Sequence, residues 1–222
     1  MKILKVLVAC EESQTVCKAF RALGHKAYSC DLKECSGGHP EWHFKASIFD
    51  VINTRKWDLL IGHPPCTYLS YAGIGHWNTP GRLEKRLEAL VFFSKLWNSG
   101  IKYICLENPK GCASPTIAKY HQEIQPYYFG DTDQKTTWLW LRNLPILKWQ
   151  KEDDMFSLKT SSGKPQPSFI DSSGKPRYFT DSIKGHGGGY EGRQKARSKT
   201  FPSIAKAMAK QWSEYILKSE HK

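Results

Sequence analysis

Two short apolar runs decide the fold of this chain: Trp57-Asp58-Leu59-Leu60-Ile61-Gly62-His63-Pro64-Pro65-Cys66 and Ile104-Cys105-Leu106-Glu107-Asn108-Pro109. Each run reads as a buried strand that stops at polar residues. Because ligands bind at the carboxyl ends of strands in open α/β sheets, we expect the two runs to bring a thiol and a carboxylate to one edge. The two prolines before Cys66 fix the backbone, so the thiol should sit on a stiff extended segment.

Strand-like and helix-like segments alternate on both sides of these runs, which predicts an α/β fold with a mostly parallel sheet covered on both faces. Strands are expected at 3–9 and 27–31, with a helix between them that Ser13 caps and Gly24 ends. The segments 126–130 and 136–142 indicate an antiparallel hairpin that closes the sheet. Longer helices are expected at about 79–98 and at 202–217. The long helix is expected to place its apolar residues in the core: Leu83, Leu87, Leu90, Val91 and 93–97.

The composition favours a polyanionic partner. The 222 residues include 33 Lys and Arg against 21 Asp and Glu, a formal charge of +12. The basic residues are dense in 155–200, which is rich in Gly, Ser and Pro and shows hardly any periodic apolar face. This stretch reads either as a phosphate-binding segment or as a linker. The length suits one core with a small appendage.

The cysteines and the hydropathy pattern bear on location. The number of cysteines, seven, is odd, and no signal peptide or membrane-spanning run is evident, so we expect a reducing cytoplasm and no membrane partner. Cys30, Cys35, His39 and His43 only loosely match a zinc site, because their spacing is irregular and no CxxC is present. No metal is therefore expected.

Several motifs resemble those of DNA (cytosine-5) methyltransferases, in particular short phage-type members with a reduced target-recognition segment. Pro64-Pro65-Cys66 with the residues up to Gly75 is similar to the nucleophile motif and its mobile loop, and Glu107-Asn108-Pro109 resembles the Glu-Asn-Val motif. Gln134-Lys135-Thr136-Thr137 is placed like the Gln-x-Arg-x-Arg strand, and 200–212 like the C-terminal motif. The resemblance implies a Rossmann-like class I fold and S-adenosylmethionine as the cofactor.

The chemistry of cytosine C5 methylation makes sense of Cys66 and Glu107. Cytosine C5 accepts a methyl group only after a nucleophile adds at C6, and a thiolate suits that addition. A free Cys has a pKa of about 8.5, so the site must activate the thiol. We expect Glu107 to be protonated by an apolar environment and to donate to N3 of the base. The expected catalytic residues are Cys66, Glu107, Asn108 and Lys135.

Cofactor and nucleic-acid contacts are expected at the strand ends and loops. The turn after the first strand should place N–H groups beside the carboxylate of the cofactor, Asp31 should accept from the ribose, and Asp50 is placed like the acid that contacts adenine. The turn lacks the glycines of the family. The expected cofactor-binding residues are Ala9, Cys10, Glu11, Ser13, Asp31, Asp50 and Pro64. The expected nucleic-acid contacts are Ser70, Gly73, Gly75, Arg142, Lys164 and Lys175.

Two further departures from the family leave alternatives open. Thr136 and Trp138 stand where the family carries two arginines, so Lys135 or Arg142 would have to substitute. The expected catalytic domain is 1–145 plus 197–222, which leaves only 146–196 as a small basic recognition insert. The leading hypothesis is methylation of a cytosine flipped out of double-stranded DNA. The alternatives are the same chemistry on RNA or a free pyrimidine nucleotide, and a non-catalytic, methyltransferase-like DNA-binding protein.

Overall fold

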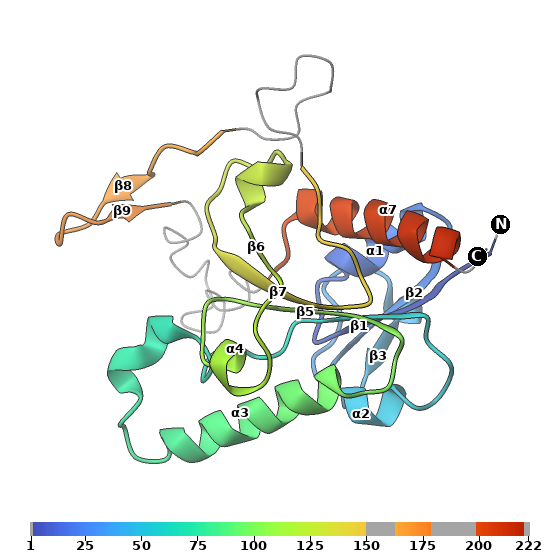
Figure 1. Cartoon of the computed structure of the whole chain (residues 1–222), viewed down its shortest axis with the longest axis horizontal. Coiled ribbons are helices and arrows are strands. Elements are labelled where there is room, and N and C mark those ends of the chain that lie inside the picture. The colour runs from blue at the N-terminus through green and yellow to red at the C-terminus, as the bar shows by residue number, and fades with distance from the viewer. Residues whose placement is uncertain (1, 150–162, 179–198, 220–222) are drawn as a thin grey trace.

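A seven-stranded sheet organises the chain (Figure 1). The structure is a computed structural model that describes residues 2–149, 163–178 and 199–219. The strand order is β3-β2-β1-β4-β5-β7-β6, and all neighbours are parallel except β7, which is antiparallel to both β5 and β6. This confirms the expected Rossmann-like α/β fold, closed by an antiparallel hairpin. The strands are β1 (Lys5–Ala9), β2 (Lys26–Asp31), β3 (His43–Lys45), β4 (Leu59–Gly62), β5 (Tyr103–Asn108), β6 (Gln122–Ile124) and β7 (Thr137–Arg142).

Helices cover both faces of the sheet, as Figure 1 shows. One face carries α1 (Thr15–Ala22) and α7 (Pro202–Ser219), and the other carries α2 (Ile48–Val51), α3 (Arg82–Trp97) and α4 (Ala113–Thr116). A small hairpin, β8 (Phe169–Ile170) with β9 (Pro176–Arg177), projects from the body. Three 3-10 helices lie in the connections: η1 (Pro40–Trp42), η2 (Tyr71–His76) and η3 (Pro126–Phe129).

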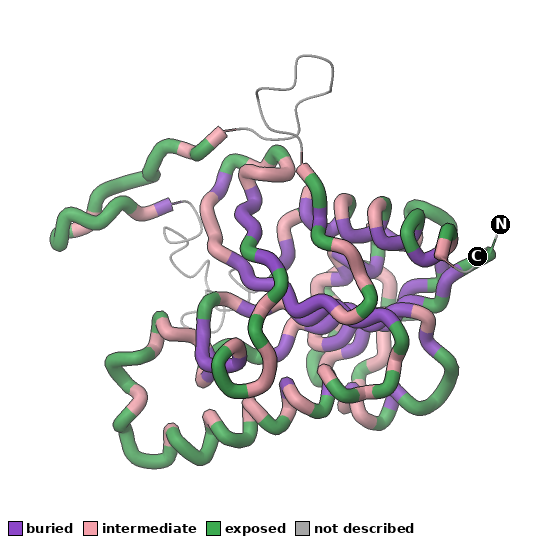
Figure 2. Tube along the Cα trace, in the orientation of Figure 1, coloured by how far each residue is buried: buried purple, intermediate pink, exposed green. Residues whose placement is uncertain are grey.

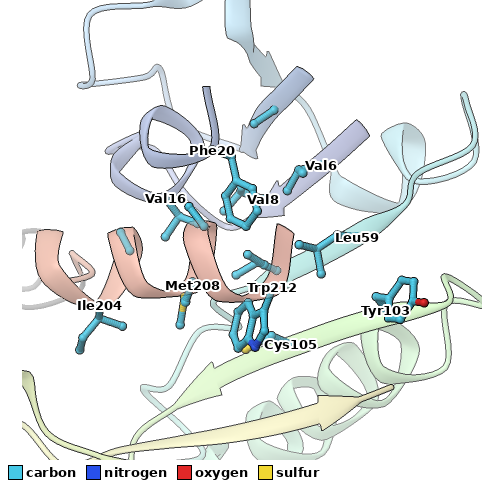
Figure 3. Packing of buried hydrophobic residues seen from close by; sticks show 14 of the residues in the cluster. Val6, Val8, Val16, Phe20, Leu59, Tyr103, Cys105, Ile204, Met208 and Trp212 are labelled. Carbon is cyan, nitrogen blue, oxygen red and sulfur yellow. The ribbon is translucent and has the colours of Figure 1, made fainter. Parts of the chain in front are cut away.

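The central strands are continuously apolar because successive side chains enter two different cores. Val6 and Val8 of β1 pack on the α1 and α7 side, whereas Leu7 packs on the α3 side. Figure 3 shows the first of these cores, where Phe20 of α1 and Trp212 of α7 are both fully buried. A strand buried on both faces has no polar side to alternate, which is why the sequence shows runs rather than alternation.

The chain just after β7 also belongs to this core. Leu147 is fully buried, and its backbone N–H and C=O both pair with the side chain of Gln122, at 2.8 and 2.7 Å. The indole of Trp212 donates to the carbonyl of Pro145 at 3.0 Å. Leu147 and Trp149 therefore pack with the main body of the fold, although the expected insert begins at 146.

The expectation that α3 buries all of its apolar residues is wrong for a stripe of three of them. Leu83, Leu87 and Val91 are 55%, 53% and 53% exposed, whereas Phe93 and Leu96 are fully buried. Figure 2 shows the first turns of α3 as largely exposed. Leu83, Leu87 and Val91 are four residues apart and share one side of the helix, whereas Phe93 and Leu96 lie on another side, which faces the core.

The first arm of the closing hairpin also differs from the expectation. The partner of β7 is β6 at Gln122–Ile124, and the expected arm at 126–130 is mostly the 3-10 helix η3. Pro126 begins this helix, and Gly130 ends it with a φ of 102°, a conformation that favours glycine. Within the described ranges, no helix has the length and apolar character needed to cross a bilayer.

Candidate active site

The segment after β4 carries Cys66 out of the sheet. The N–H of His63 donates to Ala9 O at 3.0 Å, which is the last backbone bond that this segment makes to β1. Pro64 and Pro65 follow and have no N–H to donate. The carbonyl of Cys66 then accepts from the amides of Leu69 and Ser70, at 3.0 and 2.9 Å, so a tight turn begins at the cysteine. Cys66 itself is exposed at the start of this turn.

The end of β5 fixes the same segment from the neighbouring strand. Asn108 is 3% exposed, and its side-chain amide donates to the carbonyl of Pro64 at 2.7 Å. This buried bond joins the two strand ends that the sequence predicted to meet. The role of Asn108 is therefore to position the segment that carries Cys66.

The loop beyond Cys66 is tied to the residues after β5. Ser70 and Gly111 form a β-bridge, and the amide of Tyr71 donates to Lys110 O at 3.0 Å. The backbones cross so closely that a Cβ on Gly111 would lie 2.2 Å from Leu69 O. Further along, Gly73 and Gly75 lie in η2, where the hydroxyl of Ser70 accepts from Ala72 N at 3.2 Å. The bridge holds the base of this loop, and the far end is held where Trp77 packs on the core and its carbonyl accepts from Arg86 at 3.2 Å.

A buried ion pair joins the end of β4 to β5, three residues before Cys66 in the chain. His63 Nδ1 is 3.1 Å from Glu107 Oε2, and each side chain is 12% exposed. The same carboxylate oxygen accepts from the hydroxyl of Thr200 at 3.3 Å. Lys135, in the loop before β7, is close enough to act electrostatically on both members of the pair. The end of β4, β5, the loop before β7 and the segment before α7 thus converge on Glu107.

The charge state of this pair corrects the expectation that Glu107 is protonated. Burial alone would raise the pKa of Glu107, but the hydrogen bond and positive charge of His63 outweigh burial and lower it. Burial alone would lower the pKa of His63, but Glu107, with a smaller effect from Glu11, raises it. Both directions favour a proton on the imidazole and an ionised carboxylate at Glu107.

The turn between β1 and α1 differs from the expected cofactor cradle. Glu11 is 4% exposed, and its carboxylate accepts from the amides of Val16 and Cys17 at 2.6 and 3.2 Å. The second and third amides of α1 are thus paired with the side chain of Glu11. The first amide, that of Thr15, donates to Ser13 Oγ at 3.5 Å, so Ser13 contributes to the start of the helix although Gln14 holds the N-cap position. Burial raises the pKa of Glu11 despite these bonds and the nearby His63.

The backbone of this turn replaces the missing glycines with strained residues. Cys10 and Gln14 adopt φ values of 59° and 58°. Such left-handed conformations are uncommon outside glycine and need support from the surroundings. The side chain of Gln14 supplies part of that support, because it bonds both the N–H and the C=O of His39, at 3.1 and 2.8 Å.

The two aspartates expected at the cofactor lie at the same end of the sheet. Asp31 ends β2 next to Cys10, where β1 and β2 pair Ala9 with Cys30. Burial, followed by the charge of Asp31, raises the pKa of the Cys10 thiol. Asp50 is exposed on α2 and acts electrostatically on Cys30. This edge is therefore rich in hydrogen-bond acceptors.

Arg142 is not brought to the site. It pairs across the sheet with Ile104, whereas the site lies at the other end of β5. Its guanidinium lies 4.4 Å from the ring centre of Trp97 and donates to Asn98 at 3.4 Å. Of the two expected substitutes for the arginines of the family, only Lys135 lies near Glu107.

Lys164 is exposed in the segment before β8, and Lys175 is exposed in the turn between β8 and β9 of the projecting hairpin. The turn of this hairpin is organised by Asp171, whose carboxylate accepts from the amides of Ser173 and Lys175 at 2.9 and 3.0 Å and from Arg177 at 2.8 Å. These bonds hold the pKa of Asp171 below its usual range. The sequence Ser-Ser-Gly-Lys-Pro occurs twice, at 161–165 and at 172–176. The two serines of the first copy, Ser161 and Ser162, lie outside the described residues.

Sequence reasoning missed His63, Thr200 and the capping role of Glu11. His63 adjoins the proline pair, but only the fold shows that it faces Glu107. The four residues that loosely matched a zinc site are not grouped, and His43 instead contacts Ser29 Oγ at 2.8 Å and Lys33 O at 2.9 Å. Among the described residues, no three His, Cys, Asp or Glu side chains are arranged to hold a metal ion.

No protein-family model and no curated protein sequence matches the chain. Among solved structures, it is similar to a putative DNA modification methyltransferase encoded within an E. coli prophage, at 15% identity and a TM-score of 0.43, over 76% of this chain and 56% of that one. It is also similar to the S. pombe Dnmt2 methyltransferase, at 15% identity and a TM-score of 0.43, over 67% of this chain and 52% of that one. A third similar structure is the Entamoeba histolytica methyltransferase EhMeth, at 13% identity and a TM-score of 0.48, over 72% of this chain and 57% of that one. The chain thus spans little more than half the length of these proteins. At such identities and TM-scores, its function has to be inferred from its own residues.

Proposed function

We propose that this chain is an S-adenosylmethionine-dependent methyltransferase that acts at C5 of cytosine in DNA through a covalent adduct with Cys66. The observation that carries the proposal is the pairing of an exposed thiol with a buried carboxylate at adjacent strand ends, held together by the Asn108–Pro64 bond of 2.7 Å. A nucleophile and an acid–base group at fixed separation are what addition to C6 of a pyrimidine requires.

In this proposal the reaction proceeds by addition and elimination. The thiolate sulfur of Cys66 forms a bond to C6, and N3 takes a proton from the Glu107 side, which makes C5 nucleophilic. S-adenosylmethionine, when bound, supplies the electrophilic methyl group to C5. The C5 proton then leaves to water, the S–C6 bond breaks to return the thiolate, and N3 gives its proton back to the Glu107 side. Each bond to the enzyme that forms is thus broken again.

The acceptor-rich edge near β1 and β2 fits such a cofactor. The ribose hydroxyls, adenine amine and ammonium group of S-adenosylmethionine are all hydrogen-bond donors. Asp31 at the end of β2 and Asp50 in α2 offer carboxylate acceptors for them. The methionine carboxylate of the cofactor is less well served, because Glu11 takes the amides of Val16 and Cys17. We therefore propose that hydrogen-bond donors other than the amides of Val16 and Cys17 bind the carboxylate of the cofactor.

The proposed partner is double-stranded DNA from which the target base is flipped out. The formal charge of +12 supports binding to phosphates, and Lys164 and Lys175 lie on a hairpin that projects from the body. We propose that 146–196, most of which lies outside the described residues, forms the small recognition segment, in addition to the η2 loop with Gly73 and Gly75. A reducing cytoplasm suits the catalytic thiol.

Trapping the adduct tests the chemistry. A pool of duplexes with random sequence and 5-fluorocytosine in place of cytosine should stall after addition, because fluorine cannot leave as a proton. We expect a denaturation-resistant protein–DNA species that requires S-adenosylmethionine. Cys66→Ala should abolish it, whereas the matched control Cys35→Ala, a loop cysteine away from the thiol segment, should retain it. An adduct that persists in Cys66→Ala would refute the assignment of the nucleophile.

A second substrate class is favoured by the residues that replace the arginines of the family. Trp138 stacks on Tyr120 at 4.0 Å and donates to Glu123 at 2.9 Å, and Thr136 accepts from Gln125 at 2.8 Å. Neither side chain offers a guanidinium to the base, so a base held in another way, in RNA or in a free pyrimidine nucleotide, is the alternative. Methyl transfer to RNA or to dCMP but not to duplex DNA would select this alternative. Duplex binding with no transfer to any substrate would indicate a non-catalytic DNA-binding protein.

A further inference from the structure

His63 is a buried titratable group of the site that the proposed reaction does not yet use. Its Nδ1 is 3.1 Å from Glu107 Oε2, and its Nε2 is buried with no hydrogen-bond partner among the described residues. A buried polar atom without a partner is costly, so its presence in this position calls for an explanation. The side chain of His63 is held by Glu107, and its backbone N–H is held by the carbonyl of Ala9.

The charges that face His63 favour a proton on the ring. Glu107 of β5 and Glu11 of the β1–α1 turn act as negative groups, and Lys135 from the loop before β7 acts in the opposite sense. Glu107 is the strongest of these, because it combines a hydrogen bond with its charge. An isolated carboxylate in this buried position would tend to neutralise itself by taking up a proton, and the imidazolium removes that tendency.

A carboxylate at Glu107 leaves the proposed reaction without an obvious acid. N3 of cytosine is an acceptor, and an ionised carboxylate has only acceptor oxygens. Addition of the thiolate to C6 places negative charge on the ring, and that charge must be neutralised at N3. The nearest proton that the pair holds is the one on His63 Nδ1, which already points at Glu107 Oε2.

We propose that His63 is a positioning residue that stores the proton which Glu107 delivers to N3 of the base. The inference rests on the proposed function. The N–H bond at Nδ1 breaks as an O–H bond forms at Oε2, and the neutral carboxyl group then gives that proton to N3 as sulfur bonds to C6. His63 becomes neutral, and it recovers its charge when the S–C6 bond breaks and N3 returns the proton.

The pH dependence of adduct formation shows whether His63 stores a proton or only holds Glu107 in place. The wild-type rate constant with the 5-fluorocytosine duplex should fall as pH rises through the pKa of the pair, because the proton is then lost. His63→Asn keeps a donor near the Nδ1 position but holds no titratable proton, so this alkaline fall should move to lower pH by about one pH unit or more. Thr200→Val removes the other hydrogen bond to Oε2, which acts on the pKa of Glu107 less than His63 does, so it should lower the rate and move the fall by much less than His63→Asn does.

A direct titration keeps the inference testable apart from turnover. We expect the NMR-measured pKa of His63 to drop by about 1–3 units in Glu107→Gln, since the opposite charge is gone. If the wild type forms no adduct at any pH, the proposed function fails, and this titration still reports on the pair. A His63 pKa unchanged in Glu107→Gln, or an alkaline fall at the wild-type pH in His63→Asn, would overturn the inference.

Discussion

Replacing Asn108 by alanine should loosen the segment that carries Cys66. The substitution removes the 2.7 Å bond to Pro64 O and leaves that carbonyl, on a buried residue, without its donor. Leaving a buried acceptor unpaired costs about 1–3 kcal/mol. For a chain of this size, each kcal/mol corresponds to about 2–4 °C in Tm. Adduct formation should suffer more, because a shift of about 1 Å in a reacting group can cost about 100-fold in rate.

The assay compares Asn108→Ala with a matched asparagine at the opposite end of the sheet. Asn98 is exposed at the end of α3, and its replacement by alanine should change stability by less than about 0.5 kcal/mol. Thermal unfolding measures the change in Tm, and the single-turnover rate with the 5-fluorocytosine duplex measures the change in the rate of adduct formation. Wild-type values for both in Asn108→Ala would show that this bond does not position Cys66, and the reasoning would be refuted.

Three further predictions concern binding and stability. Replacing Lys164 and Lys175 together by alanine should weaken DNA binding for all sequences and reduce the salt-dependence slope by about two units, and an unchanged slope would reduce the hairpin to a linker. Asp50→Ala should weaken S-adenosylmethionine binding by about 1–3 kcal/mol in calorimetry, and an unchanged affinity would remove Asp50 from the site. Trp212→Ala should destabilise the protein by about 3–5 kcal/mol in urea titration, because a fully buried indole is lost. A loss below about 1 kcal/mol would contradict the packing role of Trp212.

The sequence was sufficient to place the thiol and the carboxylate because both depend on local patterns. The runs at 59–62 and 103–108 are apolar on both faces, which identifies them as central strands, and polar residues mark where each strand ends. The carboxyl ends of parallel neighbours necessarily share an edge. Cys66 and Glu107 were therefore predictable as members of one site without any knowledge of their contacts.

The charge state of Glu107 was not predictable, because it depends on partners from other elements. Burial of a strand end predicts a raised carboxyl pKa, but His63 and Thr200 reverse the direction. The same limit applies to Arg142. Its distance along the chain from Lys135 is small, yet strand β7 carries it to the far end of the sheet, where it pairs with Ile104.

The contacts around Cys66 differ in kind from those further along its loop. The bond from Asn108 and the bridge between Ser70 and Gly111 hold both sides of the cysteine to the end of β5, and the backbone crossing at Gly111 leaves no room for a side chain there. Beyond Tyr71, the backbone bonds of the loop join only residues within the loop itself, and its far end is held by Arg86, which donates to the carbonyl of Trp77 at 3.2 Å. We therefore expect that the middle of η2 can rearrange while Cys66 stays in place. A preorganised nucleophile beside an adaptable loop is the division of roles that addition to a flipped base would require.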